Sequence, residues 1–416
     1  MKTLLVVLGC LMAAPLSATV WPVGPGRVHA RIAAAVQAAA AGDTLIVQPG
    51  FYEEGNILIE KPLTLIGQQY PVVNGSHTYE IFTVKSPDVT ISGFQIENSG
   101  QMNTIDIAGI KVLAVDRVRI EYNKVYRCNF GIYLSNTKDC TVRYNDVHGV
   151  PAEEQNTGNG IHLWKCERAR IEGNYTAEHR DGIYFEFVTN SDIAYNFSEK
   201  NIRYGLHFMF SHNDRYAFNH FYSNGAGVAV MYSRQVTMHD NLFDYNWGSA
   251  AYGILLKDIT DSQIHHNRFE FNSAAIYMEG ASRMTVTENE FRENGWAVRI
   301  QASCDANVLR QNNFLGNTFD VSTNGHLVLN TFENNYWDKY EGYDLDHDGS
   351  GDIPFRPVSL YAVVVEQMPH GLLLMRSFMV YLMDKAEKVM PSLTPEKLMD
   401  ERPLMHPFVS ASFHSK

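Results

Sequence analysis

One asparagine returns at the same place in successive repeats of this chain, and that regularity restricts the possible folds more than any other feature. If the first residue of each Gly-Ile-Tyr-Leu-like tetrapeptide is position zero, position fourteen is asparagine in eight successive units: Asn123, Asn145, Asn174, Asn196, Asn219, Asn241, Asn267 and Asn289. The units begin 22 to 29 residues apart. A repeat of this length is typical of a solenoid.

The residues one and three places after the start of each unit are apolar in almost every unit, as at Ile132 and Leu134. Strict alternation predicts strands whose odd positions face a core. One strand cannot bury its face alone, so stacked coils of about 22 residues would form parallel sheets around a shared core, with the asparagines as an internal ladder. The sequence therefore predicts an all-β, right-handed parallel β-helix over residues 19–358, with loops at residues 150–159 and 247–252.

The two ends of the solenoid need caps, because open strand edges invite pairing with other chains. Residues 27–41 are alanine-rich and predict a helical cap. At the far end Gln311 stands where the next asparagine should fall, so we expect the ladder to end after Asn289, with an Asp-rich capping loop at residues 335–357.

Before the N-terminal cap, residues 1–18 have the pattern of a secretory signal peptide: Lys2, an apolar run from Leu4 to Ala14, and a small-residue cleavage site ending at Ala18. Such a leader predicts export from the cytoplasm.

The Asp-rich loop places carboxylates at alternate residues with glycines for a sharp turn. This arrangement suits a hard cation such as calcium, with four candidate ligands. The alternative is a solvated, hydrogen-bonded turn. The candidate ligands are Asp344, Asp346, Asp348 and Asp352.

Residues 359–416 form a methionine-rich C-terminal extension. The apolar run 372–383 is about a dozen residues long and contains Arg376, so it is too short to span a bilayer. Such a flexible apolar segment either packs back on the solenoid or docks into a partner, and we expect docking.

The charge balance of 34 basic against 46 acidic residues gives a net charge of −12, which argues against nucleic acid and an anionic membrane surface as partners. The four cysteines of the exported chain occupy different columns of the repeat. We therefore expect buried free thiols and no disulfide. These cysteines are Cys128, Cys140, Cys166 and Cys304.

Positions two and four of each unit should face outward, which puts His207 and Met209 on one strand and Met231 directly beside Met209 on the next coil. A histidine and two thioethers suit copper(I), whereas calcium or magnesium would reject them. The simpler interpretation is an amphipathic outer face. A second outward column, His239 and His265 with His266 beside it, is a weaker copper candidate.

Many parallel β-helices act on uronate polymers, and they need paired carboxylates or a calcium-binding Asp cluster with a nearby base. Here the outward strand offers Glu186 and Glu279 four coils apart, too far to cooperate. We therefore predict no catalytic residues. Four outward aromatic residues could still stack on sugars, which leaves glycan binding open: Tyr133, Trp164, Tyr184 and Tyr277.

Three features together resemble the NosD family, periplasmic β-helix proteins of nitrous oxide reductase maturation. They are the coils from Gly109 to Asn334, the closing sequences NNYWD (334–338) and DLDHDGSGDIP (344–354), and the extension after Pro357. The single coils and the Asp-rich motif occur widely in secreted proteins, so the extension is the discriminating part.

The resemblance implies a non-enzymatic, periplasmic subunit on an ABC-type membrane permease with its cytoplasmic ATPase. It also implies transient copper(I) or sulfur delivery for the copper-sulfide cluster, with a copper chaperone and apo nitrous oxide reductase as partners. The segment from Met368 to Met405 would grip the membrane subunit. The alternative is an extracytoplasmic protein that binds carbohydrate or modifies uronate polymers.

Overall fold

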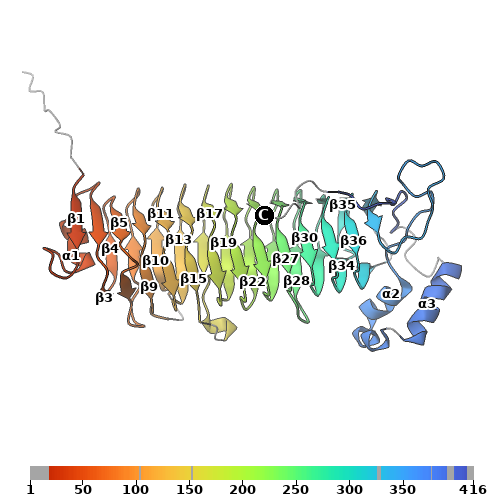
Figure 1. The fold of residues 1–416 in the computed structure, drawn as a ribbon, viewed down its shortest axis with the longest axis horizontal. Helices are drawn as coiled ribbons and strands as arrows, with labels where there is room; N and C mark the ends of the chain where they lie inside the picture. The colour runs from red at the N-terminus through yellow and green to blue at the C-terminus, as the bar shows by residue number, and fades with distance from the viewer. Residues whose placement is uncertain are drawn as a thin grey trace, which may run out of the picture.

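The protein is an elongated right-handed parallel β-helix with a short helix at its N-terminal end and a helical unit at its C-terminal end (Figure 1). The computed structural model describes residues 18–102, 105–150, 153–325, 329–375, 377–390 and 398–409. The predicted signal peptide lies outside the described residues apart from its last residue. Every strand pairs in parallel with the equivalent strand of the neighbouring coil, so the predicted fold class is confirmed.

Sheet A runs the length of the solenoid and consists of 14 strands. In spatial order these are β1 (Val20–Val23), β2 (Thr44–Val47), β5 (Thr64–Gly67), β8 (Thr90–Ser92), β11 (Arg119–Glu121), β14 (Thr141–Arg143), β17 (Arg170–Glu172), β20 (Asp192–Ala194), β23 (Arg215–Ala217), β26 (Thr237–His239), β29 (Gln263–His265), β32 (Thr285–Thr287), β35 (Asp305–Arg310) and β38 (Leu329–Glu333).

Sheet B follows sheet A in each coil and consists of 13 strands. They are β3 (Phe51–Glu53), β6 (Val72–Asn74), β9 (Gln95–Glu97), β12 (Lys124–Tyr126), β15 (Asp146–His148), β18 (Tyr175–Ala177), β21 (Phe197–Glu199), β24 (His220–Tyr222), β27 (Leu242–Asp244), β30 (Arg268–Glu270), β33 (Glu290–Arg292), β36 (Asn313–Leu315) and β39 (Tyr336–Trp337).

Sheet C carries the tetrapeptides that define the repeat and consists of 12 strands. They are β4 (Ile57–Ile59), β7 (Phe82–Val84), β10 (Ala108–Leu113), β13 (Phe130–Ser135), β16 (Ile161–Trp164), β19 (Asp181–Glu186), β22 (Tyr204–Met209), β25 (Ala226–Met231), β28 (Tyr252–Lys257), β31 (Ala274–Glu279), β34 (Trp296–Ile300) and β37 (Phe319–Thr323).

The interior of the coils is filled by columns of like residues. Ile132, Leu134 and their equivalents are buried, and a phenylalanine column on sheet B stacks ring on ring at 4.7 to 5.3 Å between centroids. The four described cysteines are free and buried within the coils, as the sequence predicted.

The asparagine ladder is longer than the sequence predicted. Asn289 donates its backbone N–H to Asn312, and Asn312 donates to Asn335, each at 3.0 Å. The turn Gln301–Cys304 holds one residue more than its equivalents, because Met278 pairs with Ile300 but Ser282 pairs with Asp305. The expectation that the ladder ends after Asn289 is therefore wrong. The extra residue in this turn moves the ladder position of the next coil from Gln311 to Asn312.

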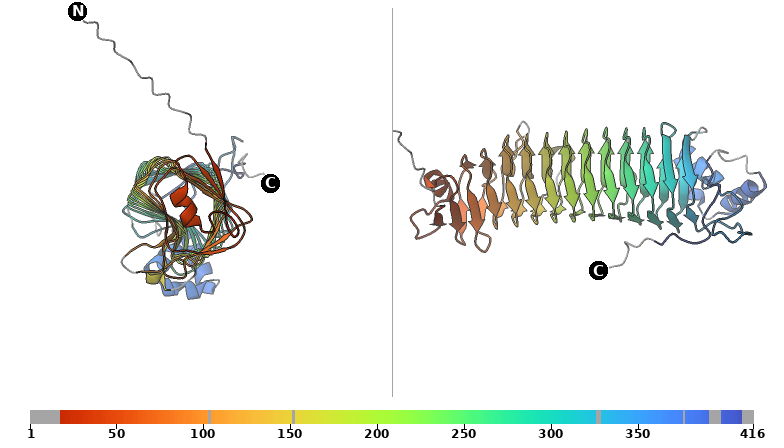
Figure 2. Two further views of the ribbon diagram at one scale, coloured as in Figure 1. Left: turned by 90° about the vertical axis from the view of Figure 1, so that its left-hand side faces the viewer. Right: turned by 90° about the horizontal axis from the view of Figure 1, so that it is seen from above.

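The N-terminal cap is a helix, but it covers only α1 (Ile32–Ala38), not residues 27–41. The helix begins where the buried Glu54 carboxylate accepts the N–H groups of Ile32 at 2.6 Å and Ala33 at 2.9 Å. Free N–H groups of a first turn need such an acceptor, and this one fixes the start of the helix. Viewed end-on, α1 lies across the mouth of the solenoid (Figure 2).

The C-terminal extension contains α2 (Leu360–Gln367), the 3-10 helix η2 (Pro369–Leu374) and α3 (Phe378–Val389). A further 3-10 turn, η1 (Glu154–Asn156), lies in the predicted loop at 150–159. Helix α2 packs on the last strand of sheet C through an apolar cluster that includes Phe319, Tyr361 and Val365. Within the described residues, no helix has the length and apolar character needed to cross a membrane.

The described end of the chain returns to the solenoid after α3. Leu398 is buried, and Asp400 forms isolated bridges with Phe332 and Phe355. The Asp400 carboxylate accepts from the backbone and the side-chain amide of Asn335, at 2.9 and 3.1 Å. Asp400 therefore occupies the place of the next ladder asparagine. Part of the predicted extension 359–416 thus belongs to the end of the solenoid.

Candidate functional site

Met209 and Met231 lie side by side on the outer face of sheet C. They end strands β22 and β25, and the parallel register pairs them directly. Both side chains are half-buried. The parallel register therefore places the two residues next to each other, as the repeat predicted, and copper binding by their sulfurs stays a prediction.

His207 lies on the same strand, two residues before Met209, but it is not on the exposed surface that the sequence predicted. Only 2% of it is exposed. Its Nδ1 lies 3.3 Å from Asp181 Oδ2, and the rings of Tyr184 and Tyr204 lie 4.8 and 4.7 Å from its own. The buried Nε2 has no hydrogen-bond partner among the described residues.

Asp181 is the residue that sequence reasoning missed. It stands one place before the glycine of its coil, at the start of β19, and is fully buried. A carboxylate accepts only, so it fixes the proton of His207 on Nδ1 and leaves the Nε2 lone pair free. Arg203 approaches Asp181 at 3.5 Å and Glu154 of η1 at 3.4 Å. The signal was available in the sequence, because Asp181 is the acidic residue among the alanine, aromatic and asparagine residues that precede the first residue of each repeat.

The aromatic residues considered for sugar binding are occupied by neighbours. Tyr133 is 9% exposed and stacks on His162, with centroids 4.6 Å apart. Lys165 covers Trp164 at 4.3 Å. Burial, with Arg180 and His207 contributing, lowers the pKa of His162 to about 3, so this imidazole is neutral. Tyr133, His162 and Tyr184 thus stack in one packed column.

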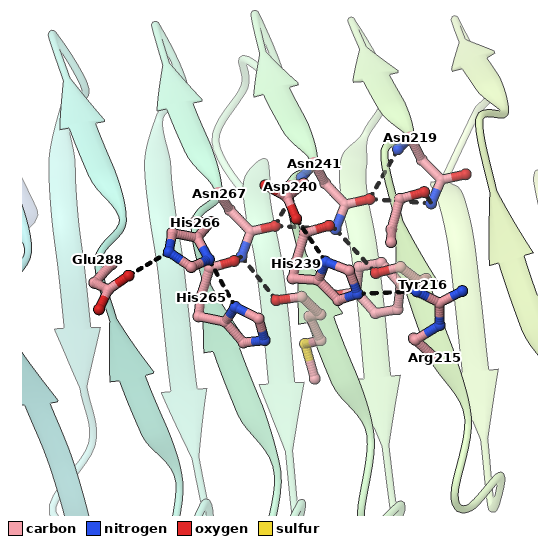
Figure 3. A network of polar contacts seen from close by, with 12 residues as sticks. Arg215, Tyr216, Asn219, His239, Asp240, Asn241, His265, His266, Asn267 and Glu288 are labelled. Atoms are coloured by element: carbon pink, nitrogen blue, oxygen red, sulfur yellow. Dashed lines mark hydrogen bonds and ion pairs between the residues drawn. The ribbon is translucent and has the colours of Figure 1, made fainter. Parts of the chain in front are cut away.

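The second histidine column forms a polar network at the turn between sheets A and B (Figure 3). The rings of His239 and His265 stack at 5.0 Å and 4°. The closer approach, however, is between His265 and His266, whose Nδ1 atoms are 3.0 Å apart. Burial, followed by the nearby His239 and His266, lowers the pKa of His265, which keeps its imidazole neutral.

The nitrogens of His239 are both engaged. Nδ1 donates to Asp240 Oδ2 at 2.7 Å, and Nε2 accepts from Arg215 at 3.2 Å. A guanidinium can only donate and a carboxylate can only accept, so these assignments are fixed. The structure thus stacks His239 on His265, as the sequence predicted, and adds a direct contact between the ring nitrogens of His265 and His266. Metal binding by this column stays a prediction.

The Asp-rich loop brings three of its four predicted ligands together. Carboxylate oxygens of Asp344, Asp346 and Asp348 lie within 4.8 Å of one another. Asp352 instead accepts from the Leu345 N–H at 2.7 Å, and Arg402 pairs with Asp348. The charge of Asp348, then desolvation, raises the pKa of Asp346. Calcium binding at this loop stays a prediction.

Comparison with known proteins gives two kinds of likeness. Residues 147–342 match a family model described as "Periplasmic copper-binding protein (NosD)". A protein of Stutzerimonas stutzeri named "Probable ABC transporter binding protein NosD" is 26% identical over 425 residues, covering 97% of this chain and 92% of the relative. A protein of the same name from Pseudomonas aeruginosa is 28% identical over 375 residues, covering 84% and 86%.

Solved structures resemble the solenoid. A surface adhesin of Streptococcus pneumoniae superimposes with a TM-score of 0.57 at 13% identity, covering 70% of this chain and 86% of that chain. The A-module of a mannuronan C-5 epimerase from Azotobacter vinelandii gives 0.56 at 15% identity, covering 72% and 91%. At such identities the likeness establishes the fold alone.

Proposed function

Since the chain belongs to the NosD family of periplasmic copper-binding proteins, we propose that it is a periplasmic subunit of an ABC-transporter complex that holds copper(I) transiently. The names of the two relatives support a transporter as partner. In this proposal a copper chaperone supplies the metal, and apo nitrous oxide reductase receives it, or sulfur, for its copper-sulfide cluster. ATP hydrolysis belongs to the partner's cytoplasmic ATPase, and this chain needs no catalytic residue.

The observation that carries the proposal is the pairing of Met209 with Met231 beside an oriented histidine on sheet C. Thioethers and imidazole are ligands that copper(I) prefers. Asp181 holds His207 with the Nε2 lone pair free, as carboxylates commonly do for metal-binding histidines. Nε2 is buried and lacks a hydrogen-bond partner among the described residues, which is an arrangement that a bound ion would satisfy.

Copper(I) titration against a chromophoric chelator, under anaerobic conditions, tests this site. We expect the double variant Met209→Leu and Met231→Leu to bind at least tenfold more weakly, because leucine keeps the volume and removes the sulfur. Met102→Leu is the matched control, since Met102 is 51% exposed and lies on a distant coil. Unchanged affinity in the double variant would end the assignment.

The docking part of the proposal rests on the apolar surface of η2 and α3. Leu373 is 88% exposed and Phe378 is 73% exposed. Large exposed apolar patches mark interaction sites in soluble proteins. The same surface includes several other large exposed side chains: Met368, Leu372, Leu374, Met375, Met379, Tyr381, Leu382 and Met390.

Co-purification with the co-expressed, detergent-solubilised permease tests the docking surface. We expect the double variant Leu373→Glu and Phe378→Glu to lose the permease while keeping the melting temperature of the parent protein. Leu345→Glu, at an equally exposed apolar side chain of the Asp-rich loop, is the control and should retain it. If the double variant Leu373→Glu and Phe378→Glu still retained the permease, docking through these helices would be contradicted.

A further inference from the structure

We propose that His265 and His266 form a second metal site, separate from the methionine pair, for a divalent cation that takes imidazole nitrogens in a square-planar or tetragonal arrangement: copper(II) or nickel(II). The two Nδ1 atoms lie 3.0 Å apart on the surface side of the turn after sheet A (Figure 3). This inference does not depend on the proposed function, because it uses different residues and a different oxidation state.

The separation of the two nitrogens fits neighbouring ligands of one ion. Two nitrogens at roughly 2.05 Å from a metal and at a right angle are about 2.9 Å apart, whereas a tetrahedral angle would put them about 3.4 Å apart. The observed 3.0 Å is close to the first value. The geometry therefore favours tetragonal copper(II) or nickel(II) over tetrahedral zinc.

The backbone explains why consecutive histidines can meet at all. In an extended strand, successive side chains point to opposite faces. His266 is in the left-handed region, with φ 54°, and this turn brings its ring back beside that of His265. The buried Asn267 side chain donates to the His265 carbonyl at 3.0 Å and to Asn289 at 3.0 Å, which ties the turn to the ladder. The pair is thus held in place before any ion arrives.

Two neighbours prepare the pair for a cation. Glu288, on the next coil, pairs with His266 Nε2, so the proton of a neutral His266 lies on Nε2 and its lone pair on Nδ1. Without an ion, His265 Nδ1–H donates to that lone pair, and a bound ion would take the place of this proton, with His265 then protonated on Nε2. A carboxylate behind a ligand histidine is a common arrangement in metal sites. His239 stacks on His265 but has no free nitrogen, because Asp240 and Arg215 engage both. It therefore serves as packing, and water would complete the coordination.

Binding of copper(II) sulfate and nickel(II) sulfate to the tag-free full chain tests the site, by calorimetry and by electron paramagnetic resonance for copper(II). His265→Thr copies Thr287, the equivalent residue of the next coil, and His266→Asn suits a left-handed position. We expect each to weaken binding at least tenfold and to remove the signal of two bound imidazoles. Glu288→Gln should weaken binding about tenfold without changing the copper(II) spectrum.

His239→Thr is the matched control, since it removes a histidine from the same network and should leave the affinity within about threefold. The double variant Met209→Leu and Met231→Leu should bind copper(II) like the parent protein. Parental binding by His265→Thr and His266→Asn would overturn the proposal. If His239→Thr weakened binding as much as His265→Thr, the assignment of His265 and His266 as the ligands and of His239 as packing would be overturned. Melting temperatures of all variants separate lost ligands from lost structure.

Discussion

A single ladder asparagine satisfies buried backbone groups in two coils. The Asn219 amide nitrogen donates to the carbonyls of Ile193 at 2.9 Å and Ala217 at 3.0 Å. Its oxygen accepts from the backbone and side chain of Asn196, both at 2.9 Å. Backbone groups at a buried turn have no water to bond, so a side-chain amide of this length fits the position better than any apolar residue.

Asn219→Ala should therefore lower the free energy of unfolding by about 3 to 5 kcal/mol, because five buried groups lose a hydrogen bond to its amide, that of Asn241 included. Urea unfolding followed by circular dichroism measures the change. A loss below about 1 kcal/mol would mean that water or a backbone shift replaces the amide.

Asp214 is a buried acid inside the same stack of coils. Its Oδ1 accepts from the Ser191 N–H at 2.8 Å, and its Oδ2 has no hydrogen-bond partner among the described residues. Burial raises the pKa of Asp214 from 3.8 to about 8. Between these two pKa values, Asp214 is protonated in the folded state and ionised in the unfolded state.

Because the folded pKa lies above the unfolded one, the stability contributed by protonated Asp214 is complete below about pH 4 and is lost as the pH rises through about 8. In the parent protein the free energy of unfolding should therefore fall by up to about 1.4 kcal/mol per pH unit as the pH rises, and Asp214→Asn should remove this fall. Urea midpoints of both proteins between pH 5 and 8.5 give the comparison. Parallel midpoints across that range would show that Asp214 titrates normally.

At the scale of the element, the coils repeat one turn in which the residue just before the ladder asparagine takes a positive φ, and this residue is a glycine before Asn174 but not before most of the others. Tyr195, Phe218 and His266 are examples, with φ between 54 and 58°. Left-handed backbone is unfavourable for such residues, and stacking of neighbouring rings offsets part of that cost. Tyr195 and Phe218 stack at 5.0 Å and 6°. Each of the two rings covers one face of the other.

The C-terminal cap depends on Asp400, which continues the hydrogen-bond pattern of the ladder. Asp400→Ala should lower the free energy of unfolding by about 2 to 4 kcal/mol, since Asn335 and the Trp337 indole lose their acceptor. Asp400→Asn should recover only part of this loss. Its amide oxygen can accept the bonds from Asn335 and Trp337, but its amide nitrogen cannot accept from the N–H groups of Asn334 and Arg402, which bond the other carboxylate oxygen. Urea unfolding distinguishes the two, and equal losses would contradict a ladder-like cap.

At the scale of the whole molecule, the helical unit is an excursion from the cap and not a free tail. The chain leaves the solenoid beyond the buried Val358 and returns at the buried Leu398. Arg299 of sheet C pairs with Glu366 of α2 at 2.8 Å. The helices that carry the exposed apolar surface are thus attached to the last coils at both ends.

Truncation after Pro357 should consequently do two things at once: abolish partner binding and lower the melting temperature by several degrees. The chain would lose Asp400 and Leu398 together with the helices. Differential scanning calorimetry of the truncated chain beside the Leu373→Glu and Phe378→Glu variant separates the effects. An unchanged melting temperature in the truncated chain would contradict a structural role for the returning segment.

The sequence alone determined the solenoid, the register of its coils as far as Asn289, and the placing of Met209 and Met231 next to each other in neighbouring coils. Equivalent positions of a repeat must stack, so a count along the chain becomes a map in space. It did not show His207 against Asp181, the contact between the Nδ1 atoms of His265 and His266, or Asp400 at the end of the ladder. Those contacts depend on a residue outside the inward-outward alternation, a left-handed turn, and a segment that returns from 65 residues away. No periodic pattern records such features, so only the tertiary structure could decide them.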